Sequence, residues 1–523
     1  MNVEAGTLPP ERKAELKAAG LKVLAATAVA GGLFALYAHE VKVEAEVQDL
    51  LSGVKIATGR AGGARSDLNR DTVRGWLSAE EALNRALDLQ PSNPWAVAAM
   101  ADVEVMLSSA GVDGRGPRAE EALARADAKD LNLPERFEAH GLHLIAAGQA
   151  AEAETWSLSL LDRYGSLPRV VDVLGRAQRA TGKLSEAKAN FKRAQDADWR
   201  SPRFVADYGQ ALLEDGNAGE AAAAFDRALQ ANSDHSRGQI GKARALVALS
   251  LLGRGGTDLK AARALCDAVL AKKPEELPGP LKAQALAARS TVSLAEGALP
   301  AAASDAEAAV RADPKSSQAL RAKALASAAS KSPEAVALFK AAIDADRYDA
   351  SLYFEGAAAL AAAGDGAGAE KILGACAATL PRSARYHLSL AQLLARRDDN
   401  AAAKAELAKA EALEPTNAQV YFEEGRLAQK QRDNKGAVAA YERAVKLRDD
   451  YPEVYRQMGA LYLEGKDVDG ALKVFNEALA RYKSARAPAP VMESFYSDVV
   501  DQVSRAGKKK LAQEWVREAR ALH

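Results

Sequence analysis

The chain has 523 residues, and its 70 lysine and arginine residues balance 70 aspartate and glutamate residues, so the formal net charge is zero. A balanced chain has no overall basic field that would draw it to nucleic acid, and we expect no nucleic-acid partner. Aromatic residues make up only 5% of the chain, which suits thin, closely packed helix pairs. The two cysteines, Cys266 and Cys376, do not indicate a disulfide framework.

The first predicted element is an apolar helix near the N-terminus. The run from Val23 to Ala38 contains no charged residue. Extended back to Ala18, with Lys22 reaching the headgroups, it has about 21 residues, which is enough to cross a bilayer. The sequence therefore predicts a transmembrane helix over residues 18–38. Two alternatives are a buried helix of the folded domain and a cleaved signal peptide, although the polar head before the run is long for a signal peptide.

Basic residues lie on the N-terminal side of this run, and acidic residues predominate directly after it. The preceding cations are Arg12, Lys13, Lys17 and Lys22. Because an excess of Lys and Arg marks the cytoplasmic side of a span, residues 1–17 are predicted to be a cytoplasmic segment. The remainder would lie across the membrane, in the periplasm of a bacterium. This interpretation describes a single-pass protein of the inner membrane.

Residues 39–75 are predicted to be a juxtamembrane helix followed by a Gly-rich linker. The helix is indicated by apolar residues at helical spacing, namely Val43, Val47, Leu50 and Leu51. The linker is indicated by the glycines and arginines between Gly53 and Arg65, a composition typical of flexible segments. We expect this linker to let the rest of the chain tilt relative to the membrane.

From Trp76 onward, small and large residues recur with a period of 34. Gly175 and Gly209 are 34 residues apart, as are Phe191 and Phe225. The clearest case lies further on, where Gly425, Ala437, Tyr441 and Ala444 recur as Gly459, Ala471, Phe475 and Ala478. A fixed period of this length indicates stacked helix pairs, in which small residues let the backbones approach and a ring fills the space between them. The spacing resembles the tetratricopeptide repeat (TPR).

The resemblance implies an all-α fold: a right-handed superhelical α-solenoid of about twelve TPR-like helix pairs, preceded by the one transmembrane helix. Residues 76–274 would be an N-terminal TPR block and residues 275–315 a weak repeat at which the array bends. Residues 316–486 would be a C-terminal TPR block, and residues 487–523 a capping helix pair. With the apolar run in front, the chain resembles the bacterial membrane-anchored type of TPR protein.

In the family, certain first-helix positions line a concave groove that receives a peptide or a partner helix. On the three units from Ala384, these positions carry Arg385, Gln392, Arg396, Gln419, Phe422, Arg426, Gln429, Lys430 and Arg456. The resemblance therefore implies a groove that hydrogen-bonds a peptide backbone and pairs with acidic side chains. The unit at Pro168 adds Arg169, Arg176 and Arg179. Acidic neighbours such as Glu423 favour the alternative, an ordinary solvated face.

The sequence contains no recognisable catalytic motif, such as HExxH, GxSxG, CxxC or GxxxxGK[ST]. His140 and His143 lie one turn apart, but no carboxylate or cysteine completes a metal-binding motif around them. We therefore expect no enzymatic activity, no cofactor and no metal.

The predicted function is a non-enzymatic, membrane-anchored scaffold for protein–protein interaction. It would assemble a cell-envelope complex for secretion, pilus formation, motility or wall synthesis, and would contact its subunits through their acidic segments. Two alternatives remain: a soluble cytoplasmic TPR adaptor or co-chaperone, and a regulatory subunit of an enzyme complex. The scaffold itself does not name its ligand.

Overall fold

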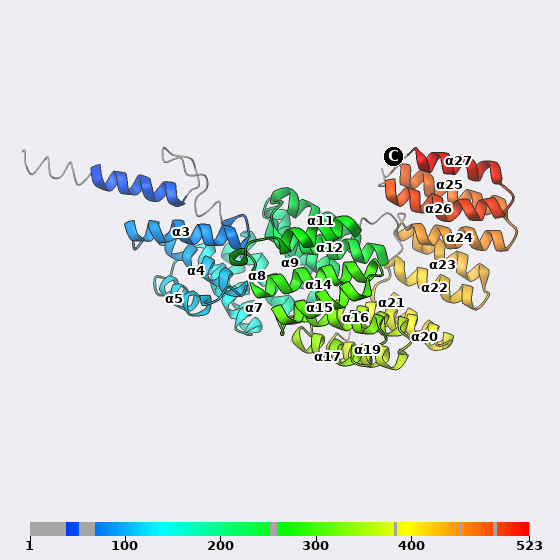
Figure 1. The fold of residues 1–523 in the computed structure, drawn as a ribbon, viewed down its shortest axis with the longest axis horizontal. Helices are drawn as coiled ribbons and strands as arrows, with labels where there is room; N and C mark the ends of the chain where they lie inside the picture. The colour runs from blue at the N-terminus through cyan, green and yellow to red at the C-terminus, as the bar shows by residue number, and fades with distance from the viewer. Residues whose placement is uncertain are drawn as a thin grey trace, which may run out of the picture.

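The computed structural model describes residues 38–51, 68–251, 259–380, 384–448, 451–484 and 489–521. Within these ranges every regular element is a helix, and after α3 (Val73–Leu89) the helices alternate as antiparallel pairs (Figure 1). The first helices of the pairs are α4 (Pro94–Ser109), α6 (Pro134–Ala146), α8 (Pro168–Ala180), α10 (Pro202–Glu214), α12 (Ser236–Leu251), α14 (Gly279–Ala295), α16 (Ser317–Ala329), α18 (Ala350–Ala362), α20 (Ala384–Arg396), α22 (Ala418–Lys430), α24 (Pro452–Glu464) and α26 (Ala489–Arg505).

The second helices of the pairs are α5 (Arg115–Ala128), α7 (Ala150–Tyr164), α9 (Leu184–Ala197), α11 (Ala218–Ala231), α13 (Leu259–Leu270), α15 (Leu299–Ala312), α17 (Ala335–Ala345), α19 (Gly366–Thr379), α21 (Asn400–Leu413), α23 (Asn434–Leu447), α25 (Val468–Ser484) and α27 (Lys509–Arg520). A short 3-10 helix, η1 (Pro274–Glu276), precedes α14. The pairs stack side by side, with α27 at the C-terminal end of the stack (Figure 1). The predicted all-helical solenoid is confirmed.

The packing inside each pair is the one that the 34-residue period predicted. The ring of Phe191 on α9 lies 2.9 Å from the point that a Cβ on Gly175 of α8 would occupy. The same approach is even closer between Gly425 and Tyr441 on α22 and α23. In these two pairs the first-helix position is glycine because a side chain would overlap the ring of the second helix, whereas the equivalent positions Ala357 and Ala391 carry alanine.

The turn between the two helices of a pair also repeats with the period. Gly148, Gly182 and Gly216 have φ values of 80°, 83° and 86°, a left-handed conformation that suits glycine. In the later repeats an aspartate begins the second helix: Asp399 and Asp433 each accept a hydrogen bond from the backbone N–H three residues on, at 3.2 and 2.9 Å. These caps satisfy amide groups that a helix start leaves without partners.

The fold class predicted from the sequence needs one correction. In the part of the chain that the structure describes, no helix combines the length and the apolar composition that crossing a bilayer requires. The predicted span, residues 18–38, and the segment before it lie outside the described residues, apart from Ala38. The helix described over residues 38–51 is amphipathic and carries Glu40, Glu44 and Glu46. A transmembrane helix is therefore not part of the solenoid described here.

The helix over residues 38–51 packs against the solenoid by its apolar stripe. Val47, Leu50 and Leu51 are buried in one cluster with Leu83 of α3. Glu46 also pairs with Arg85 of α3 at 3.5 Å. The helix is therefore docked on α3 and acts as the first member of a pair with it. The predicted Gly-rich linker between the two helices lies mostly outside the described residues.

Segments about 165 residues apart in the sequence come together and close the first turn of the superhelix. Near its start, the side chain of Asn232 donates a hydrogen bond to the backbone oxygen of Arg70 at 2.7 Å. Further along, Arg179 of α8 pairs with Asp346 before α18 at 2.9 Å. Arg385 of α20 donates to the backbone oxygen of Glu214, at the end of α10, at 2.7 Å. We call these contacts, together with the pair His235–Asp71, the seam.

The segment predicted as a weak repeat and bend, residues 275–315, contains η1, α14 and α15. Its small residues Ala306 and Ala309 are buried against Ala319 and Ala322 of α16, so the stack continues through this segment. The predicted division of the chain into blocks stays a prediction.

Candidate protein-binding surfaces

The inner side of the first turn is lined by charged residues from consecutive first helices. Arg169 of α8 pairs with Asp102 of α4 at 2.9 Å and with Glu138 of α6. Arg176 of α8 donates to Asp172 at 2.9 Å, and contacts Asp207 of α10 at 2.5 Å. We call the set the inner network; its members are Asp102, Glu138, Arg169, Asp172, Arg176, Arg203, Asp207 and Arg237.

The carboxylates of the inner network are buried. The side chains of Asp102, Glu138 and Asp172 are at most 1% exposed. Burial raises the pKa of Asp172 to about 7, despite Arg176, because burial disfavours the charged form and Asp207 adds repulsion. Burial acts in the same direction on Asp207, but Arg176 and Arg237 outweigh it and hold the pKa of Asp207 below its usual value. The network therefore works as a polar core.

This network changes the interpretation of three predicted groove residues. Arg169 and Arg176 are fully engaged with carboxylates of the same chain, as described above. Arg179 pairs with Glu214 at 2.8 Å and with Asp346 across the seam. The acidic groups that these arginines were expected to bind in a partner are thus supplied by neighbouring repeats. These three arginines are therefore not available to pair with an acidic ligand.

The nine predicted groove residues lie on α20, α22 and α24, but they differ in accessibility. Arg385 belongs to the seam, and its guanidinium lies 4.6 Å from the ring centroid of Phe354. Burial lowers the pKa of Arg385. Phe422 is only 2% exposed and packs against Tyr441 and Tyr451 in the core. Neither residue presents its side chain to a ligand, so both have structural roles.

A buried carboxylate, Glu423, brings several of the other predicted residues together. It accepts hydrogen bonds from Gln392 of α20 at 2.9 Å and from Gln419 at 3.1 Å. Arg426 pairs with it at 3.2 Å, and the Arg426 side chain is 56% exposed. Glu423 thus fixes the positions of three predicted residues from below. This organising role of Glu423 was not predicted from the sequence, where Glu423 counted only as an acidic neighbour that favours a solvated face.

The remaining predicted residues are paired in part. Lys430 pairs with Asp398 at 2.6 Å, and Gln429 accepts a hydrogen bond from the Tyr441 hydroxyl at 3.0 Å. Arg456 contacts Asp498 of α26, which lies in the predicted capping pair and was not considered as part of the groove. Arg396 is exposed and makes no hydrogen bond or ion pair with the described residues. The accessible part of the predicted site is therefore Arg396, Arg426 and Lys430.

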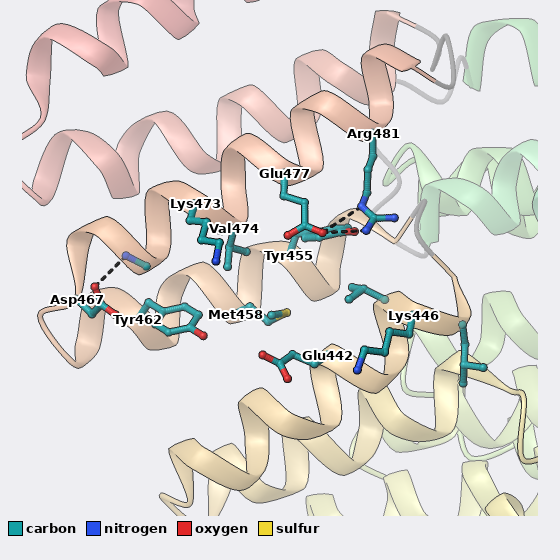
Figure 2. Close-up of a pocket in the computed structure, with 13 residues that line it drawn as sticks. Glu442, Lys446, Tyr455, Met458, Tyr462, Asp467, Lys473, Val474, Glu477 and Arg481 are labelled. Carbon is teal, nitrogen blue, oxygen red and sulfur yellow. Dashed lines mark hydrogen bonds and ion pairs between the residues drawn. The ribbon is translucent and has the colours of Figure 1, made fainter.

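A second surface lies between the second helices α23 and α25, above α24. It is a pocket of about 800 Å³, and Figure 2 shows Glu442 and Lys446 on one side and Lys473, Val474 and Glu477 on the other. Met458 and Tyr462 of α24 lie between the two walls. We call this pocket the α23–α25 groove. Sequence analysis did not predict it.

A metal centre is not indicated by the described ranges, where no three His, Cys, Asp or Glu side chains come together as ligands. His140, one of the two histidines considered in the sequence, lies 3.1 Å from Asp127 and stacks on Trp156. Both cysteines are buried, and burial raises the pKa of each thiol to about 12.

A family model described as tetratricopeptide repeat matches the chain at residues 173–236 and 422–486. These two segments contain the glycine and ring pairs from which the sequence pattern was recognised. The chain therefore contains tetratricopeptide repeats, as predicted. No curated protein matches the chain.

Several solved structures match the chain at low sequence identity and with TM-scores below 0.5. The crystal structure of yeast Tom70 is 13% identical with a TM-score of 0.40, and the alignment covers 85% of this chain and 96% of Tom70. A chain of the APC/C hetero-tetramer Cut9-Hcn1 is 15% identical with a TM-score of 0.29, over 78% and 91% of the two chains. Human IFIT1, as a dimer with m7Gppp-AAAA, is 15% identical with a TM-score of 0.35, over 73% and 90%.

Proposed function

We propose that the chain is a scaffold for protein–protein interaction and that it binds a partner on the first helices α20 and α22. Tetratricopeptide repeats suit such a role because stacked helix pairs present extended, rigid surfaces without a catalytic pocket. The proposal goes further by assigning the partner to one part of the solenoid.

One observation supports this assignment. The arginines on the first helices of the first turn and those on α20 and α22 differ in what they contact. In the first turn the arginines are consumed by buried carboxylates and by the seam. On α20 and α22, by contrast, Arg396 and Arg426 keep exposed guanidinium groups beside the amides of Gln392 and Gln419. Exposed guanidinium groups can bind the carboxylates of an extended segment.

The partner is therefore proposed to contribute an extended segment with acidic residues. Two predictions depended on residues 18–38: that the partner belongs to a cell-envelope complex, and that the chain lies at the inner membrane. These residues lie outside the described residues, apart from Ala38. Both stay predictions from the sequence.

The proposal is tested by site-specific photo-crosslinking in the native cells. A photoreactive amino acid replaces Arg396 on the proposed surface, and a matched variant carries it at Lys371, which is exposed on the second helix α19. We expect the variant at residue 396 to crosslink a partner protein, and replacement of Arg426 by Glu in that variant to reduce the crosslink. Equal crosslinking from residues 396 and 371, or none from 396, would refute the proposed surface.

A further inference from the structure

The α23–α25 groove is long enough for a helix. Its α25 wall runs from Gly470 to Arg481, which at 1.5 Å per residue is about 17 Å, or three helical turns. Its lining mixes charged and apolar side chains, and the apolar ones include Val445 and Leu447 on α23, Met458 on α24 and Val474 on α25. Leu447 is 42% exposed, although large apolar side chains are mostly buried in this solenoid.

The preceding gap, between α21 and α23, is closed by the chain itself. Arg443 of α23 crosses it to pair with Glu411 of α21 at 2.6 Å. The guanidinium of Arg443 also lies 4.0 Å from the ring centroid of Tyr421 on α22, so it covers the floor of that gap. This ion pair acts as a bridge between two neighbouring second helices.

The α23–α25 groove has lost this bridge. In the repeat register, 34 residues on, Arg443 is replaced by Glu477 and Glu411 by Val445. A carboxylate and a valine cannot form an ion pair, and Glu477 instead pairs with Arg481 on its own helix at 2.8 Å. The gap is therefore left open at the point where its neighbour is bridged, as Figure 2 shows.

The open groove carries charges of both signs, and each wall has one lysine without an ion-pair partner in the part of the chain that the structure describes. Lys446 projects from α23 and Lys473 from α25, and neither has an ion-pair partner among the residues described (Figure 2). Of the three carboxylates, Glu477 pairs with Arg481 and Asp467 accepts the backbone N–H of Gly470 at 2.8 Å, whereas Glu442 makes no ion pair with the residues described. A ligand carboxylate between the two lysines would complete both pairs.

We propose that the α23–α25 groove binds an amphipathic helix of a partner protein. The helix would place apolar residues spaced i, i+4 and i+7 against Met458, Val474 and Leu447, and an acidic residue between Lys446 and Lys473. This surface is formed by second helices and is distinct from the first-helix surface proposed above. The inference thus goes beyond the proposed function and does not depend on it.

The test uses the full chain and two synthetic helical peptides of about 16 residues. Both carry leucines at i, i+4 and i+7; one has a flanking Glu and the other a Lys at the same position. Fluorescence anisotropy of the labelled peptides gives the affinities. We expect the Glu peptide to bind about tenfold more tightly than the Lys peptide, and the variant K446E/K473E to invert that preference.

Two further variants make the test specific. The control K340E/K371E changes two exposed lysines of other second helices and should leave the preference unchanged. The variant V445E/E477R recreates the bridge seen between Arg443 and Glu411 and should weaken binding of the Glu peptide about tenfold, with an unchanged melting temperature. This variant tests closure of the groove without removing any apolar residue except Val445.

Three results would overturn the inference. The wild-type chain could bind neither peptide, both peptides could bind equally well, or K446E/K473E could leave the preference unaltered. Light scattering adds a fourth result. If the wild-type chain and the variant V445E/E477R differ in molar mass in solution, the groove is a contact between copies of the chain. The crosslink from residue 396 is read separately, so failure of one proposal leaves the other standing.

Discussion

At the scale of single residues, the glycine at the close approach of two helices is the most demanding position of those pairs that carry it. A Cβ at Gly425 would overlap the ring of Tyr441, which is itself fully buried. We expect Gly425→Ala to lower the free energy of unfolding by about 1 to 3 kcal/mol, because the added methyl overpacks the helix pair. Denaturant unfolding followed by circular dichroism measures the change.

Gly374 provides the matched control for this substitution. It lies inside helix α19, and a Cβ there would meet no atom within 4 Å. Gly374→Ala should therefore raise the free energy of unfolding by about 0.5 to 1 kcal/mol, since alanine favours the helix more than glycine does. A similar effect of both substitutions would contradict the packing described for the repeat.

Asp172 is the residue of the inner network whose titration should be visible in stability. Its pKa is about 7 in the folded chain and 3.8 without perturbation. Between these pH values Asp172 is therefore protonated in the folded state and ionised in the unfolded state. The stability that Asp172 contributes therefore falls as pH rises from about 4 to about 7. Replacing it by Asn removes this titration while Arg176 keeps its contact with Asp207.

We compare the free energy of unfolding of Asp172→Asn with that of the wild type. We expect this difference to shift in favour of the variant by about 1 to 3 kcal/mol between about pH 5 and about pH 8. Thermal unfolding of both proteins at the two pH values measures this difference. Asp207, whose pKa is lowered, contributes stability that is lost only below about pH 4, outside this window. A pH-independent difference would show that Asp172 is ionised in the folded chain throughout.

Residue roles were predicted well where the repeat period determines them and poorly where distant segments meet. The period located Gly175, Gly425 and their partner rings, because these contacts lie within one helix pair. It also placed Arg385 on the inner side, but the partner of Arg385 is the backbone of Glu214, 171 residues earlier. Nothing in a local pattern reveals such a partner, since it depends on the curvature of the whole superhelix.

At the scale of helices, the caps are the clearest local determinant. Asp433 begins α23 by accepting the N–H of Gly436 at 2.9 Å. We expect Asp433→Ala to reduce the free energy of unfolding by about 1 kcal/mol and Asp433→Asn to be nearly neutral, because Asn caps equally well. Denaturant unfolding of the two variants checks this; equal losses would mean that the charge, and not the cap, matters.

The helix over residues 38–51 shows where element prediction succeeded and where it did not. Its apolar stripe was recognised from Val47, Leu50 and Leu51, and these residues are buried as expected for a helix. Its packing partner was not predicted: the stripe packs on α3. Periodicity identifies a buried face but does not say what buries it.

At the scale of the whole molecule, the seam determines the shape of the first superhelical turn. Two of its contacts depend on single guanidinium groups, those of Arg179 and Arg385. We expect the variant R179A/R385A to keep its helical content but to expand, because the repeats remain folded while the ends of the turn separate. Small-angle X-ray scattering detects the larger radius of gyration. The control R311A, at an exposed pair on α15, should not expand.

The same closure explains why the candidate surface could be predicted only in part. The family pattern pointed to inner first-helix residues in both halves of the chain. In the first turn these residues meet one another and form a polar core, whereas Arg396 and Arg426 on α20 and α22 stay exposed. The α23–α25 groove escaped prediction because it arises from a missing ion pair, at Val445 and Glu477, and an absent contact leaves no motif.

The account rests most on the closed first turn, and the distance across the seam in solution tests it directly. Spin labels are placed at the exposed residues Ser185 and Arg347, one on each side of the seam, after substitution by cysteine. The native cysteines, Cys266 and Cys376, are buried and should not react. Pulsed electron resonance should give one short, narrow distance distribution, which broadens and lengthens in R179A/R385A. A long or broad distribution in the otherwise unmodified chain would contradict the closed turn.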